Sequence, residues 1–212
     1  MADITQQLDN IMERVRSGFA SKNSAREKAL PLCREAIRYS ANAIRAVHRH
    51  EFEVARELAG KAGAALRIAK ESLADHPDIY FAGFVHDSQK EFAEASITLA
   101  LIEGAELPTP AGLDVEHAAY LNGMGEAIGE LRRHLLDTLR TGDIESCEGW
   151  LTAMDEMYGV MVTVDYPDAM TGGLRRTTDS VRGILERTRG DYTMSLQQKR
   201  LEEKIDTFNQ KL

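Results

Sequence analysis

Apolar residues recur three and four positions apart along most of the chain, which is the spacing of one face of an α-helix. Residues 4–19 illustrate this pattern with Leu8, Ile11, Met12, Val15 and Phe19. No segment shows the strict apolar and polar alternation of a half-buried β-strand. The pattern therefore predicts an all-α protein.

Short breaks rich in glycine, proline and aspartate divide the helical pattern into segments. The segments predicted as helices are 4–19, 26–50, 51–74, 80–103, 115–141, 144–163, 169–189 and 192–211. The first two are also compatible with one long helix. The only proline-rich connector, residues 105–112, has the length of a loop. We expect an antiparallel bundle of about seven helices, formed by residues 1–212 as a single domain.

The composition of 43% hydrophobic and 28% charged residues is typical of a soluble globular protein. The polar N-terminus does not resemble a signal peptide, and the longest apolar run, residues 97–102, is too short to span a membrane. Cys33 and Cys147 lie within helical patterns, where unpaired buried thiols are expected. We therefore expect a cytoplasmic protein without membrane contact. The net charge of −8 does not by itself favour nucleic-acid binding, but it leaves room for a local basic surface.

A first pair of carboxylates lies on the predicted helix 80–103. Glu91 and Glu94 are three residues apart, so they point to the same side of the helix, at the edge of its apolar stripe. A buried charge without a partner is costly. These two side chains therefore need protonation, an ion-pair partner or a metal ion.

A second pair, Glu126 and Glu130, lies on the predicted helix 115–141, opposite its apolar stripe. One interpretation is a solvated face, because charged residues are mostly exposed. Against it, the same side carries small residues that would let another helix approach: Ala119, Gly123, Ala127 and Gly129. If the two helices are neighbours, the four carboxylates form an all-oxygen pocket that suits Mg²⁺, Mn²⁺ or Ca²⁺.

A third feature is a set of arginines on the segment 26–50, which fall within about 60° of one another on a helical wheel: Arg34, Arg38, Arg45 and Arg49. They can follow a phosphate backbone, or they can pair with Glu35, Glu51 and glutamates of other helices. His48 and His50 are interpreted as surface histidines near the helix end.

Other candidates for chemistry are weaker. His86 and His134 are near the acidic pairs in sequence, but neither forms a Glu-x-x-His motif with them, which argues against a ferritin-like di-iron centre. Trp150 and the methionines that follow it at helical spacing are interpreted as core or as an interface stripe.

The order and spacing of several segments make the chain resemble the translin family, and within it the translin-associated factor X (Trax) branch in a short prokaryotic form. The segments that carry the resemblance are 34–49, 89–95, 113–133 and 142–144. The resemblance extends from about residue 27 to the C-terminus. It implies a seven-helix bundle that assembles into hollow, often octameric, shells that bind single-stranded RNA and DNA.

In the Trax branch, a carboxylate cluster carries metal-dependent endoribonuclease activity. Glu91 and Glu94 match the Glu-x-x-Glu of that branch, Glu126 stands where the branch has an aspartate, and Glu130 matches a glutamate one turn further on. The basic and histidine-rich segment of translin is not reproduced, because residues 81–85 are apolar here.

The leading hypothesis is therefore a Mg²⁺- or Mn²⁺-dependent endoribonuclease that acts on single-stranded RNA as a homo-oligomer. Glu91, Glu94 and Glu126 would ligate the metal, and Glu130 would be a fourth ligand or a base. The four arginines would hold the flanking strand, either RNA or single-stranded DNA. Two alternatives stay open: a non-catalytic oligomeric binder of single-stranded nucleic acid, and an all-α nucleoside triphosphate pyrophosphohydrolase, which also places Glu-x-x-Glu around Mg²⁺.

Overall fold

The computed structural model describes residues 4–210, and all regular structure within them is α-helical. The six long helices are α1 (Ile4–His48), α2 (Phe52–Ser72), α4 (Gly83–Glu103), α6 (His117–Arg140), α7 (Glu145–Met161) and α9 (Leu174–Asn209). Three single turns complete the described chain: α3 (Pro77–Tyr80), α5 (Pro110–Leu113) and α8 (Asp168–Thr171). The prediction of an all-α bundle is confirmed.

Two of the expected breaks lie inside continuous helices. Of the two interpretations of residues 4–50, the single long helix is confirmed: α1 runs from Ile4 to His48 and continues through Pro31. Proline removes one backbone hydrogen bond, but Ala29 and Cys33 on either side of it are buried against neighbouring helices. Gly190 likewise lies inside α9, where glycine costs only about 1 kcal/mol relative to alanine. Burial of Tyr192 against α6 and α7 extends the helix past this point.

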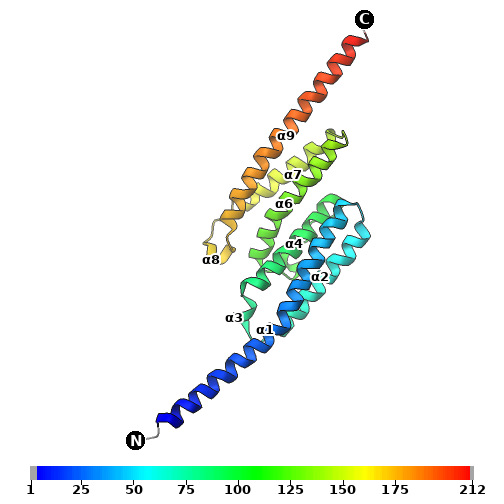
Figure 1. Ribbon diagram of the computed structural model, residues 1–212. Helices are drawn as coiled ribbons and strands as arrows, with labels where there is room; N and C mark the ends of the chain where they lie inside the picture. Colours follow the sequence, from blue (N-terminus) through cyan, green and yellow to red (C-terminus); the bar gives the residue numbers. More distant parts are fainter. Residues whose placement is uncertain (1–3, 211–212) are drawn as a thin grey trace.

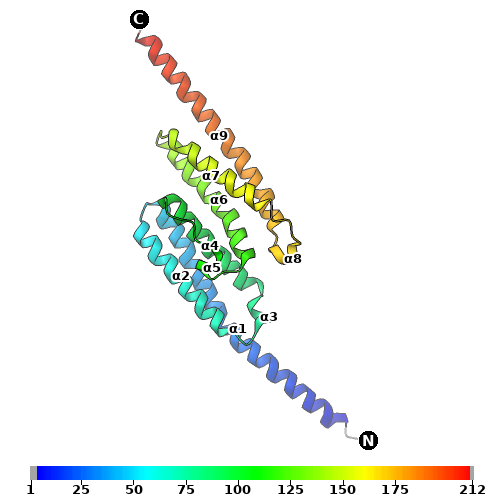
Figure 2. The same cartoon turned by 180° about the vertical axis from the view of Figure 1, so that it is seen from behind.

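The long helices form two groups that meet at α4 and α6 (Figures 1 and 2). In the first group, α1 packs against α2 and α4. In the second, α6 packs against α7 and α9. Because α4 is covered on both sides, its Phe92 faces the alanine-rich core of the first group, while its Ile97 faces the core of the second. This position explains why the sequence of α4 is apolar on almost every side.

The cores differ in character between the two groups. Around α1 and α2 the buried residues are mainly alanines, which let the helices approach closely. Around α6 the core contains larger side chains, among them Ile128, Leu131, Met154 and Val181. The thiols of Cys33 and Cys147 are both free and buried, as predicted.

The ends of α1 and α9 extend beyond the bundle in opposite directions (Figure 1). Every residue from 4 to 20 is exposed, and so is every residue from 200 to 210. The exposed apolar side chains of these ends are Ile4, Leu8, Ile11, Met12, Val15 and Phe19 on α1, and Leu201, Ile205 and Phe208 on α9. Among the helices of residues 4–210, none has an apolar stretch long enough to cross a lipid bilayer.

Candidate metal centre and nucleic-acid interface

The crossing of α4 and α6 is closest at Gly123. A Cβ atom at this position would lie 2.6 Å from the carbonyl oxygen of Lys90 and 2.9 Å from the backbone nitrogen of Glu94. The predicted helix contact through small residues is therefore confirmed at Gly123. Gly129 is different, because its nearest neighbour is Ile184 of α9 at 4.0 Å. The close approach at Gly123 brings Glu126, three residues further along the same face, toward α4.

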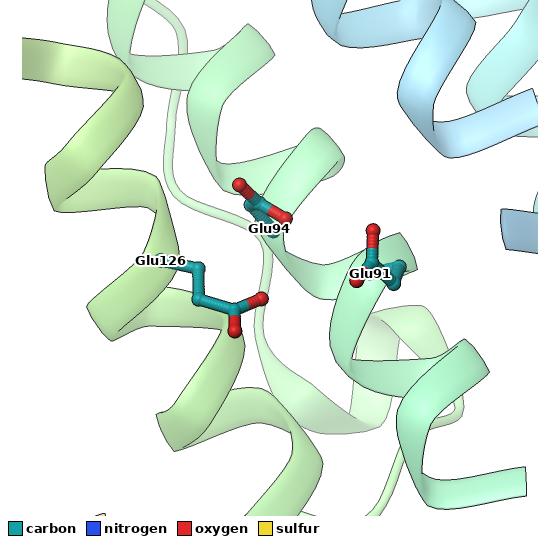
Figure 3. A group of neighbouring side chains, drawn as sticks. All are labelled: Glu91, Glu94 and Glu126. Atoms are coloured by element: carbon teal, nitrogen blue, oxygen red, sulfur yellow. The ribbon is translucent and has the colours of Figure 1, made fainter. Parts of the chain in front are cut away.

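Three of the four candidate glutamates come together at this crossing. Glu91, Glu94 and Glu126 each offer a carboxylate oxygen, and these oxygens all lie within 4.8 Å of one another (Figure 3). No other set of three histidine, cysteine or acidic side chains reaches this proximity within residues 4–210. Glu126 points toward α4 and contacts Lys90, while 38% of its side chain remains exposed, so this face is packed and solvated at once.

Glu130 lies beside this cluster and not within it. Its Oε2 is 2.5 Å from Nε2 of His48 on α1, and Arg133 is 3.7 Å away. The hydrogen bond from His48 lowers the pKa of Glu130, against the opposing effect of burial. Because Glu130 is therefore ionised and accepts the bond, Nε2 of His48 carries the proton.

The interpretation of His48 as a surface histidine is wrong. Its side chain is only 5% exposed. The helix end at residue 48 suggested exposure, but Glu130 of α6 contacts the ring at Nε2 and the side chain is buried. The partners His48 and Glu130 are 82 residues apart, so no local pattern connects them.

Lys90 is the site residue that the sequence patterns did not single out. Its Nζ is 2.6 Å from Oε1 of Glu126 and 4.0 Å from Oε1 of Glu91. Burial lowers the pKa of Lys90, but the hydrogen bond to Glu126 and the neighbouring carboxylates more than offset this effect and raise it. The only sequence signal was its position next to Glu91. The ammonium group supplies a resident positive charge at the edge of the carboxylate cluster.

The electrostatics of the cluster are dominated by Glu94. Burial raises the pKa of Glu94 to about 8, and the charges of Glu126, Glu91 and Glu130 act in the same direction. Glu94 forms no hydrogen bond or salt bridge with any other described residue. The pKa of Glu91 is raised too, first by burial and then by the charge of Glu126. At neutral pH the protein by itself therefore holds an extra proton at this cluster.

These residues fit a hard divalent cation. The donors are carboxylate oxygens, which Mg²⁺ and Mn²⁺ prefer. Within residues 4–210, Lys90 is the only cationic side chain in an ion pair with these carboxylates, so the cluster lacks enough positive charge to balance all three of them. A divalent cation would offset both the burial and the mutual repulsion that raise the pKa values of Glu91 and Glu94. Their roles as ligands stay a prediction.

The predicted arginine stripe is exposed along its length on α1 and just beyond its end. Arg38 lies 3.1 Å from Glu35, Arg45 donates to Asn42 at 2.8 Å, and Arg49 lies 2.7 Å from Glu51. These partners are all local, and the two ion pairs, with Glu35 and Glu51, are at the surface, where such pairs contribute little to stability. The guanidinium groups therefore remain accessible to an anion, and their role in binding nucleic acid stays a prediction.

Comparison with known proteins finds relatives that align with most of the chain. No model of a protein family matches it. An uncharacterized protein of Methanocaldococcus jannaschii, MJ0175, is 32% identical over 190 residues, which are 88% of this chain and 83% of the relative.

Solved structures of similar fold include two of AfC3PO. One is the protein alone, with 33% identity, a TM-score of 0.79, and coverage of 87% of this chain and 96% of the other. The second is a complex of AfC3PO with duplex RNA, with 33% identity, a TM-score of 0.78, and coverage of 87% and 95%. A structure of apo-NeC3PO, at 20% identity with a TM-score of 0.72 over 89% and 96%, shares the fold.

Proposed function

Because this chain belongs to the translin family, we propose that it binds RNA and cleaves it with the help of a divalent cation, as a Trax-like endoribonuclease. The observation that carries the proposal is the meeting of Glu91, Glu94 and Glu126 at the crossing of α4 and α6. Glu94 in particular has a raised pKa and no hydrogen-bond partner in the described chain. Structural glutamates are normally paired or solvated, so this arrangement suits a metal-binding role.

In this proposal the three carboxylates hold Mg²⁺ or Mn²⁺. The cation, when bound, supplies positive charge at the scissile phosphate and makes a water molecule a better nucleophile. Glu94 gives up its proton when the cation binds, because a carboxylate ligand must be ionised. Lys90 holds Glu126 in place through their 2.6 Å contact and adds one positive charge near the phosphate.

The His48–Glu130 pair supports the same site from one helical turn further along α6. Glu130 orients the imidazole of His48 through Nε2 and keeps the proton on that atom. The charge of Glu130 also contributes to the raised pKa of Glu94. We therefore assign Glu130 to positioning and electrostatics, in place of the fourth metal ligand that the sequence suggested.

Two further features of the chain support RNA binding by an oligomer. The exposed arginines Arg34, Arg38, Arg45 and Arg49 can contact phosphates along α1. The projecting ends of α1 and α9 expose apolar side chains that a second copy of the chain would cover. Relatives of known structure include a complex with duplex RNA, so the strandedness of the RNA has to be tested directly.

The test uses the full chain with end-labelled RNA, single-stranded or duplex, in Mg²⁺, in Mn²⁺ or in EDTA. We expect cleavage only with a divalent cation. Glu91→Gln should lower the cleavage rate by about a hundredfold or more, because it removes one ligand charge, while RNA binding in EDTA persists. The matched control is Asp87→Asn, one turn away on α4 but outside the cluster, which should change the rate by less than about threefold.

The outcomes separate the competing functions. If the Glu91→Gln variant cleaved RNA in the presence of metal as fast as the parent, the assignment of the carboxylate cluster as the metal site would be wrong. Salt-sensitive RNA binding without cleavage in any metal would identify a non-catalytic binder. Release of pyrophosphate from free nucleoside triphosphates would identify a pyrophosphohydrolase.

A further inference from the structure

A cavity lies between the end of α1, the last turns of α6 and the start of α7. Its volume is about 470 Å³, within the range of small-molecule sites, about 300–1,000 Å³. We call it the histidine pocket; it is lined by His48, His50, His134, Asp137, Thr138, Arg140, Thr141, Asp143, Ser146 and Trp150. The roles proposed for the carboxylate cluster and for the arginine stripe do not give this pocket a function.

The histidine pocket is connected to the carboxylates through shared residues. His48 borders the pocket and contacts Glu130 on its other side. On α6, Glu126, Glu130 and His134 follow one another at intervals of four residues, so they lie along one face. With a rise of 1.5 Å per residue, Glu126 and His134 are about 12 Å apart along the helix axis. A short stretch of an extended strand that passes the carboxylates can therefore reach the pocket.

The rings in the pocket are arranged edge to face. The ring centroids of His134 and Trp150 are 4.9 Å apart with an interplanar angle of 86°, and those of His50 and His134 are 5.9 Å apart at 67°. Neither pair is stacked face to face, and all three residues line the cavity, where a further planar group can meet them. Aromatic and imidazole faces are the common stacking partners of unpaired bases.

The charges in the pocket argue against a phosphate or a metal ion as the main ligand. Asp137 and Asp143 are part of its lining and would repel a phosphate. Burial lowers the pKa of His134, and the neighbouring His50 and His48 lower it further, so this ring is neutral. The only set of three close metal-ligand atoms found in residues 4–210 is the glutamate cluster, so the histidines are not arranged for a metal ion.

We propose that the histidine pocket binds one unpaired nucleobase of the RNA strand, stacked against Trp150 and the neighbouring imidazoles. Arg140 also lines the pocket; its side chain is 81% exposed and lies 3.4 Å from Asp137, and in this proposal it contacts the phosphate of the bound nucleotide. The inference rests on the proposed function for its ligand. The inference also predicts a preference for single-stranded over duplex RNA, because a base inside a duplex is not free to enter the pocket.

The fluorescence of Trp150 can report directly on stacking in the pocket, since Trp150 is the only tryptophan of the chain. The full-length protein is titrated in EDTA with three end-labelled probes: a single-stranded RNA of about ten nucleotides, its duplex, and an abasic ribose-phosphate oligomer of the same length. Binding is followed by the anisotropy of the label, and stacking by the Trp150 emission. We expect the single strand to quench this emission, while the abasic oligomer and the duplex do not.

The matched variants are His50→Gly and His117→Ala. His50 has a φ angle of +58°, a left-handed backbone conformation that glycine adopts without strain. His50→Gly should therefore keep the thermal midpoint of unfolding but weaken single-strand binding by about fivefold or more. His117 is an exposed histidine at the opposite end of α6, and its substitution should leave both quantities unchanged.

Two results would overturn the proposal in distinguishable ways. If single-stranded RNA binds but the Trp150 emission stays constant, or if the abasic oligomer quenches it equally, the pocket is not a base site and RNA binding stands. If neither RNA probe binds, the proposed function itself fails, and the pocket assignment fails with it.

Discussion

Glu94 is the residue through which the proposed metal binding would depend on pH. Its carboxyl group has a pKa of about 8 because it is buried and surrounded by three other glutamates. The usual value is 4.5, so between these two values the folded protein binds a proton that the unfolded chain does not. Protonated Glu94 therefore contributes its full stability below pH 4.5, the pKa of the unfolded chain. This contribution is lost as the pH rises through about 8, the pKa of the folded protein.

We expect the affinity for Mn²⁺ to rise with pH up to about 8 and then to level off. Below that value the cation has to displace the Glu94 proton, so the affinity should change by about tenfold per pH unit. The measurement is isothermal titration calorimetry in buffers of different ionisation enthalpy, which also counts the released protons. Glu94→Gln should bind Mn²⁺ more weakly and with no such slope. An equal slope in this variant would show that another group titrates.

At the scale of elements, the geometry of the site depends on how closely α4 and α6 cross. Gly123 permits this crossing because any side chain would collide with the backbone of α4 at Lys90 and Glu94. The spacing of the three carboxylates follows from that contact, since Glu91 and Glu94 lie on one helix and Glu126 on the other.

Gly123→Ala should therefore lower the free energy of unfolding by about 1–3 kcal/mol, because it overpacks the crossing. It should also weaken Mn²⁺ binding by moving Glu126 away from α4. The control is Gly129→Ala on the same helix, where the new methyl group meets only Ile184 at an ordinary contact distance. That variant should be more stable by about 0.5–1 kcal/mol, since alanine favours the helix. Urea denaturation measures both, and a Gly123→Ala protein as stable as the parent would contradict the close approach.

At the scale of the whole molecule, the projecting end of α1 has the features of an assembly surface. Leu8, Ile11 and Val15 lie on one side of a fully exposed helical segment, with exposed fractions of 54%, 56% and 42%. Such a stripe is normally covered in a stable protein. In the proposed homo-oligomer, the partner that covers it is a second copy of the chain.

Replacing Leu8, Ile11 and Val15 by glutamate should reduce the particle mass seen by analytical ultracentrifugation. The thermal midpoint of the bundle should change little, because residues 4–20 are exposed and lie outside its cores. The control places three glutamates on the opposite side of the same segment, at Gln6, Asn10 and Ser17. If both triple variants sediment like the parent, the stripe is not an assembly surface.

The sequence alone determined the features that depend on local spacing. Period-three and period-four patterns predicted the all-α fold, and helix spacing singled out four candidate carboxylates, Glu91, Glu94, Glu126 and Glu130, of which the first three meet. The small residue Gly123 signalled which side of α6 could approach another helix. These signals succeed because a helix fixes the direction of each side chain from its position in the chain.

Tertiary packing decided the rest. His48 is buried against Glu130, which is 82 positions away in the sequence. Glu130 contacts His48 and does not belong to the carboxylate cluster. The contact of Lys90 with Glu126 and the continuation of α9 through Gly190 also depend on neighbouring helices. No local pattern contains this information, because burial and long-range contacts set both the charge of a carboxyl group and the cost of a helix-breaking residue.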